Sequence, residues 1–143
     1  MIKIYCEHSA LSKQLREFQR QGRIELVHFP YDPDSRSRYL RQIAVPSAAQ
    51  IRDLNLPYRD LPGTFEDYAG SPLLEAILRI IGQQNRRDAL HLDSAHKSDC
   101  TAFVTVDSDI LGYRAELGEL LGMYLFHPVA DEGALAEFVG RAE

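Results

Sequence analysis

Four acidic residues of this sequence stand where a folded chain could bring carboxylates together, namely Glu7, Asp88, Asp107 and Asp109. Glu7 directly follows a segment of β-branched and aromatic residues, and Asp107 directly follows another, so both are expected at strand ends. Asp109 comes two residues later, and Asp88 opens a predicted helix, where the helix dipole favours a carboxylate. Since the carboxyl ends of parallel strands share one edge of a sheet, the four side chains are predicted to converge there.

Carboxylates that crowd together repel one another unless a cation binds between them. Oxygen ligands suit Mg²⁺ or Mn²⁺, and such an ion can activate a water molecule and stabilise charge at a phosphorus centre. The same acids also have ordinary structural explanations. Glu7 lies just ahead of a predicted helix, Asp88 suits a helix dipole, and aspartates such as Asp107 and Asp109 are common in turns.

The first thirty residues predict a strand, a helix and a second strand. Residues 2–6 alternate in the manner of a strand. Ser9 is placed to cap a helix with one apolar stripe, which Gly22 is expected to end. Residues 24–29 predict the second strand, and this strand–helix–strand beginning is typical of a parallel sheet.

Residues 30–70 hold five of the seven prolines and have weaker patterns. Short elements are expected there, as helices near 36–43 and 47–54 and a strand around 54–58. The same segment clusters cations and aromatic rings, which together could grip RNA through its phosphates and bases. A solvated helix face is the ordinary alternative for these residues, which are Arg36, Arg38, Arg41, Tyr31 and Tyr39.

Regular patterns return at Ser71 and Pro72, which suit the N-cap and first position of a helix that runs to residue 81. Asp131 is expected to cap the last helix. Between these lie predicted helices over 86–97 and 113–121 and predicted strands over 101–106 and 123–126. Strands that alternate with helices predict an α/β fold, with helices on both faces of a mostly parallel sheet, in one domain spanning 1–143.

The 143 residues carry a formal net charge of −5, which argues against a surface that binds nucleic acid everywhere but is compatible with a local basic patch. No apolar run approaches the ~18 residues that span a bilayer, and no secretion signal is recognisable, so we expect a cytoplasmic protein without membrane contact. Cys6 is expected to be a small core residue, with neither a disulfide nor a zinc site. Asp93 and Asp99 are expected at the surface.

Three segments resemble the PIN-domain family of nucleases. Ile-Tyr-Cys-Glu-His-Ser-Ala-Leu at 4–11 is similar to the family's first motif, a hydrophobic strand followed by Asp-Thr-Ser/Asn-Val-Leu. Arg-Asp-Ala-Leu-His-Leu-Asp-Ser-Ala at 87–95 is similar to its third motif. Phe-Val-Thr-Val-Asp-Ser-Asp-Ile-Leu at 103–111 is similar to its Phe-Val-Thr-x-Asp-x-Asp-Phe/Leu-Leu motif. The resemblance covers the two ends of the chain.

This resemblance implies a three-layer α/β/α PIN-like fold and a metal-dependent ribonuclease. Glu7 would take the place of the first-strand acid and Asp88 that of the helix-start acid. Asp107 and Asp109 would form the last acidic pair, preceded by the hydroxyl of Thr105. By resemblance these acids hold one or two Mg²⁺ or Mn²⁺ ions, and a metal-bound water attacks the RNA phosphodiester. Family toxins also imply an antitoxin protein and a homodimer as partners.

Two departures from the family pattern favour an alternative, a PIN-like RNA- or protein-binding module that has lost catalysis. The first acid is Glu7 where the family has Asp, and the second acid has no obvious counterpart, although Asp34 is our preferred candidate over Asp32. Arg86 and Arg87 are further candidates for contact with RNA phosphates, and solvent exposure is their ordinary explanation. A receiver-like phosphate-binding domain suits the order of the elements poorly.

Overall fold

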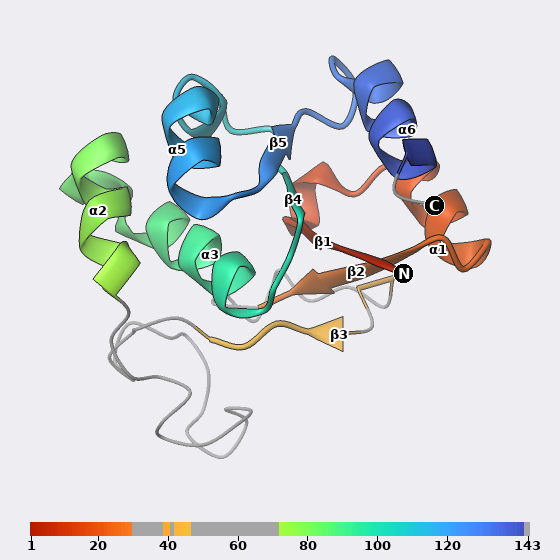
Figure 1. Ribbon diagram of the computed structural model, residues 1–143, viewed down its shortest axis with the longest axis horizontal. Coiled ribbons are helices and arrows are strands. Elements are labelled where there is room, and N and C mark those ends of the chain that lie inside the picture. The colour runs from red at the N-terminus through yellow and green to blue at the C-terminus, as the bar shows by residue number, and fades with distance from the viewer. Residues whose placement is uncertain (30–38, 41, 47–71, 142–143) are drawn as a thin grey trace.

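The computed structural model describes residues 1–29, 39–40, 42–46 and 72–141 (Figure 1). Its strands are β1 (Ile2–Cys6), β2 (Ile24–His28), β3 (Gln42–Ile43), β4 (Ala102–Val104) and β5 (Tyr124–Phe126). They form one sheet in the order β3-β2-β1-β4-β5, and every neighbouring pair is parallel. The chain therefore starts at the centre of the sheet and builds it outwards in both directions, so that β1 is flanked by β2 and β4.

Helices cover both faces of this sheet, which gives the predicted three-layer α/β/α arrangement. One layer contains α1 and α6, and the other contains α2, α3 and α5 (Figure 1). The bounds of the helices are α1 (Lys13–Arg20), α2 (Pro72–Ile81), α3 (Arg86–Lys97), the short α4 (Ser108–Leu111), α5 (Arg114–Leu121) and α6 (Glu132–Arg141). Of the helices described, none combines the length and the apolar character that a membrane crossing requires.

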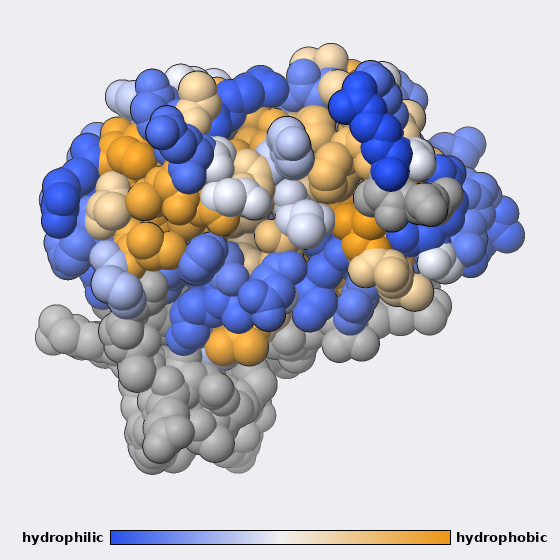
Figure 2. All heavy atoms as spheres, in the orientation of Figure 1, coloured by the Kyte–Doolittle hydropathy of each residue, from blue (hydrophilic) through white to orange (hydrophobic). Residues whose placement is uncertain are grey.

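The alternation of side chains along β1 divides the core between the two faces. Ile4 and Cys6 pack with Leu15 of α1 on one face, while Tyr5 packs with Phe103 and the second helical layer on the other. All five side chains are fully buried, and Cys6 is a core residue as predicted. Figure 2 shows apolar side chains gathered over α2, α3 and α5. Burial of such surface is the main stabilising contribution to the fold.

The structure corrects some predicted bounds. Ser12, rather than Ser9, caps α1, because its Oγ accepts a hydrogen bond from the Leu15 N–H at 3.2 Å; Ser9 lies in a 3₁₀ turn over His8–Ala10. The predicted helix over 36–43 is wrong at its end, where Gln42–Ile43 form β3 beside β2. The elements predicted over 47–54 and 54–58 lie outside the described residues.

Candidate active site at the carboxyl edge of the sheet

Two central strands bring acidic residues to the same edge. The Glu7 N–H donates to the Val104 carbonyl at 3.2 Å, which ties the residue after β1 to the end of β4. Asp107 follows β4 by three residues, and Asp88 lies in the first turn of α3. Glu7 and Asp107 thus follow two neighbouring parallel strands at the same edge of the sheet.

Glu7 carries the most perturbed carboxyl of this group. Its pKa is raised from 4.5 to about 7, mainly by burial and in smaller part by the charges of Asp88 and Asp107, while a hydrogen bond from the Thr105 hydroxyl to the carboxylate opposes the rise. Within the described part of the chain, the Oε1 atom of Glu7 is buried without a hydrogen-bond partner. A buried oxygen of this kind is unfavourable unless a proton or a cation satisfies it.

Asp88 and Asp107 interact directly. The pKa of Asp88 is raised from 3.8 to about 6, mainly by burial and then by the charge of Asp107 and a hydrogen bond with its carboxylate. The charge of Asp109 adds a smaller contribution in the same direction. Asp88 therefore feels the charges of Asp107 and Asp109, and Glu7 feels those of Asp88 and Asp107. Like charges at short range favour the binding of a proton or a cation.

Asp107 also has a structural role. Its Oδ1 accepts a hydrogen bond from the Asp109 N–H at 2.8 Å and so caps α4, which sequence patterns did not predict. The Thr105 Oγ1 in turn accepts from the Asp107 N–H at 3.0 Å. Thr105 is fully buried and Asp109 is exposed. Asp107 therefore both caps α4 and belongs to the acidic group.

The donor set fits a hard divalent cation by its chemistry. Among the residues that the structure describes, no group of three or more His, Cys, Asp or Glu side chains is already arranged to hold a metal ion. Mg²⁺, however, keeps several of its waters and needs only one or two carboxylates from the protein. The unpartnered Oε1 of Glu7 and the Asp88–Asp107 pair provide such oxygen donors.

A group of packed rings lies next to this edge, with Tyr5, His28 and Phe103 buried and His91 half-buried. The Tyr5 hydroxyl is hydrogen-bonded to Nδ1 of His91 at 2.5 Å and accepts the Phe29 N–H at 3.2 Å. The Tyr5 ring stacks on Phe103 with centroids 5.1 Å apart, and His28 stacks on His91 at 5.5 Å. Burial lowers the pKa of His91 to about 3 and that of His28 to about 4, so both rings are neutral at physiological pH.

This ring group connects the strand that precedes Glu7 with the helix that carries Asp88. Tyr5 lies two residues before Glu7, and His91 lies one helical turn after Asp88. No sequence pattern predicted this ring group. The spacing of His91 from Asp88 on one helix face was the available signal, but nothing local indicated that Tyr5 would reach across to α3.

The remaining candidates have different placements. Asp34, Arg36 and Arg38 lie outside the described residues. Arg86 and Arg87 are exposed in the first turn of α3, beside Asp88.

The expectation that Asp93 is a surface acid is wrong, since it is fully buried, whereas Asp99 is exposed as expected. Asp93 is buried because it lies on a stretch of α3 that faces the core on several sides, between Leu92 and Ser94, which are also buried.

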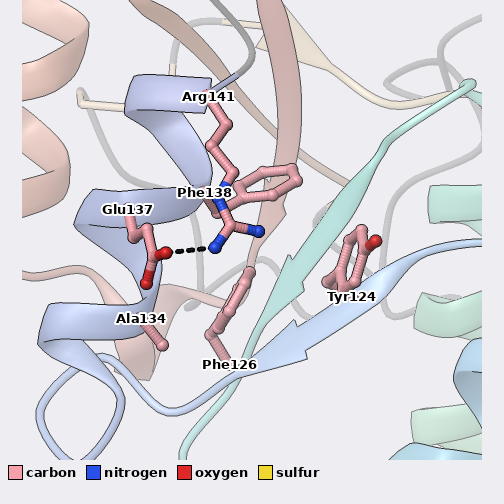
Figure 3. Close-up of a pocket in the computed structure, with 6 residues that line it drawn as sticks. All are labelled: Tyr124, Phe126, Ala134, Glu137, Phe138 and Arg141. Carbon is pink, nitrogen blue, oxygen red and sulfur yellow. Dashed lines mark hydrogen bonds and ion pairs between the residues drawn. The ribbon is translucent and has the colours of Figure 1, made fainter.

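A separate cavity of about 380 Å³ lies between β5 and α6 (Figure 3). Tyr124, Phe126 and Phe138 form its aromatic wall, and the carboxylate of Glu137 is ion-paired with Arg141. None of the four acids lines it. The crowded carboxylates that could bind a metal ion lie at the carboxyl edge of the sheet and not in this cavity.

Comparison of the chain with protein-family models, with curated proteins and with solved structures finds no match.

Proposed function

We propose that the protein is a divalent-metal-dependent endoribonuclease that hydrolyses RNA phosphodiester bonds at the carboxyl edge of its sheet. The observation that carries the proposal is the electrostatic coupling of Glu7, Asp88, Asp107 and Asp109 at one place, with the pKa of Glu7 raised to about 7 and that of Asp88 to about 6. Perturbed carboxyls that share a site are typical of functional centres.

Glu7, Asp88, Asp107 and Asp109 would hold Mg²⁺ or Mn²⁺, which supplies activation of water and stabilisation of charge on the phosphate. Thr105 orients Glu7 by donating to its carboxylate, and it also accepts the Asp107 N–H. The Tyr5–His91 hydrogen bond holds β1 against α3 and so limits the separation of Glu7 and Asp88. RNA is the proposed substrate, and a protein antitoxin and a homodimer stay predictions of the family resemblance.

A second candidate function is an RNA- or protein-binding module without catalysis. The residue type at position 7 favours it, because the family that the sequence resembles has Asp there and the extra methylene of Glu7 displaces the carboxylate. The two candidates differ in whether a divalent ion binds at the acids.

Asp107→Asn is the most direct test. The new amide oxygen can still accept the Asp109 N–H and cap α4, so the fold should persist while the site loses a charge. We expect Mn²⁺ binding by calorimetry and Mn²⁺-dependent cleavage of RNA in the wild type, and neither in the variant. Asp99→Asn is the matched control, because Asp99 is exposed at a φ of 61°, a conformation that asparagine tolerates well. Undiminished cleavage by Asp107→Asn would refute the nuclease, and absence of Mn²⁺ binding in the wild type would favour the binding module.

A further inference from the structure

The outer face of α1 presents cations in a regular row. Lys13, Arg16 and Arg20 are all exposed, and their i, i+3, i+7 spacing places them on one side of the helix. The row extends over about 10 Å at 1.5 Å per residue. Figure 2 shows hydrophilic side chains over this part of the surface, at the right of the view. The chain has a net charge of −5, so this row is a local positive patch on an acidic protein.

The row lines a groove of about 510 Å³, together with Glu17, Gln19 and Tyr39. Glu17, the acidic residue in this lining, is paired with Arg20. Arg20 Nε donates to Glu17 Oε2 at 3.0 Å, and the two side chains form an ion pair at 2.5 Å. Lys13 and Arg16 therefore give the groove a positive balance.

Tyr39, which is distant from α1 in the chain, forms one wall of the groove and is held there through the side chain of Gln19. Gln19 Nε2 donates to the Tyr39 carbonyl at 2.7 Å, and Gln19 Oε1 accepts the Leu26 N–H of β2 at 2.9 Å. This amide bridge fixes Tyr39 against α1. The Arg16 guanidinium lies 4.7 Å from the centre of the Tyr39 ring, an arrangement that orients a cation and a π surface towards the same groove.

We propose that this groove binds the phosphate backbone of single-stranded RNA. Charge complementarity selects a polyanion, and the stacked Arg16–Tyr39 pair adds the planar surface on which unpaired bases stack. Lys13 opens α1 six residues after Glu7, so the segment that follows the first strand supplies both an acid of the candidate site and the first cation of the row. The inference rests on the proposed function in one respect, that RNA is the substrate, and it adds a binding surface for that substrate outside the acidic site.

Binding of a short fluorescein-labelled oligouridylate, measured by fluorescence anisotropy in EDTA, tests the groove without metal or cleavage. The variant is Lys13→Gln with Arg16→Gln, and the matched control is Arg79→Gln with Arg141→Gln, which removes the same charge from exposed positions on α2 and α6. Because each phosphate contact contributes about 0.7 to the slope of log K against log salt, the slope should fall by about 1.4 in the groove variant. Its affinity should fall by more than about tenfold at low salt, while the control stays near wild type.

Equal weakening by both variants would show a diffuse electrostatic effect and would overturn the proposal, as would unchanged binding by the groove variant. Loss of binding to phosphatidylserine vesicles, with RNA binding intact, would assign the groove to an anionic membrane instead and would also overturn it. Failure of the nuclease proposal gives a different pattern, because a chain without metal-dependent cleavage would still lose RNA affinity when the groove is altered. Thermal unfolding of each variant verifies that these surface changes leave the fold intact.

Discussion

The charge of Glu7 should make the metal-free fold less stable as pH rises. Its pKa is raised from 4.5 to about 7 in the folded chain, so between these values the folded state binds a proton that the unfolded state has released. Stability is therefore highest below pH 4.5 as far as this group is concerned, and it is lost as pH rises towards 7. At 1.36 kcal/mol per pKa unit, the charged form is destabilised by about 3 kcal/mol.

Glu7→Gln removes this charge and keeps the shape of the side chain and an oxygen that the Thr105 hydroxyl can reach. We expect the free energy of unfolding to rise by up to about 3 kcal/mol at pH 8, which corresponds to about 6–12 °C in Tm for a chain of this size. At pH 4.5 the gain should be below about 0.5 kcal/mol, because the wild-type carboxyl is then largely protonated in the folded state.

Urea denaturation in EDTA at the two pH values measures this difference. Glu119→Gln on the exposed face of α5 is the control, and it should change stability by less than about 0.5 kcal/mol at either pH. Saturating Mn²⁺ should then stabilise the wild type more than Glu7→Gln, because a ligand that binds only the folded state adds its binding free energy to stability. A variant no more stable than wild type at pH 8, or one with the same gain at both pH values, would refute the reasoning.

Two further predictions concern the ring group next to the acidic site. Tyr5→Phe deletes the hydroxyl bonded to His91 and to the Phe29 N–H, so urea denaturation should show a loss of about 1–3 kcal/mol, whereas Tyr124→Phe at an exposed position should have no effect. His91 has a pKa lowered from 6.5 to about 3, so the unfolded chain binds its proton first and stability falls as pH drops through that range. The dependence of unfolding free energy on pH between about 7 and 4 should therefore be shallower in His91→Gln, and an equally steep fall would contradict this assignment.

Local sequence patterns were sufficient for much of the secondary structure. The predicted helices over 72–81 and 86–97 agree with α2 and α3, and the strand over 2–6 agrees with β1. These segments carry their own signals, since apolar periodicity, caps and β-branched runs act within a few residues. Gly22, with a φ of 75° after α1, is a similar local signal.

The predictions were wrong where contacts between residues distant in the chain determine the local structure. Gln42–Ile43 became a strand because the end of β2 offered backbone partners, a long-range pairing that no nearby residue encodes. Asp93 is buried because α3 is covered on more of its faces than its own amphipathic pattern indicates. Propensity is a weak prior that tertiary packing overrides.

By itself, the sequence determined the alternation of strands and helices and the position of Glu7 and Asp107 after two strands. The parallel arrangement then brings those acids to one edge, because the carboxyl ends of parallel strands lie together. The way in which the acids perturb one another follows from the folded chain, since burial and charge at short range depend on β1, β4 and α3 together. The same holds for the Tyr5–His91 bond and for the stacking of Arg16 on Tyr39, whose partners are separated by 86 and 23 positions in the chain.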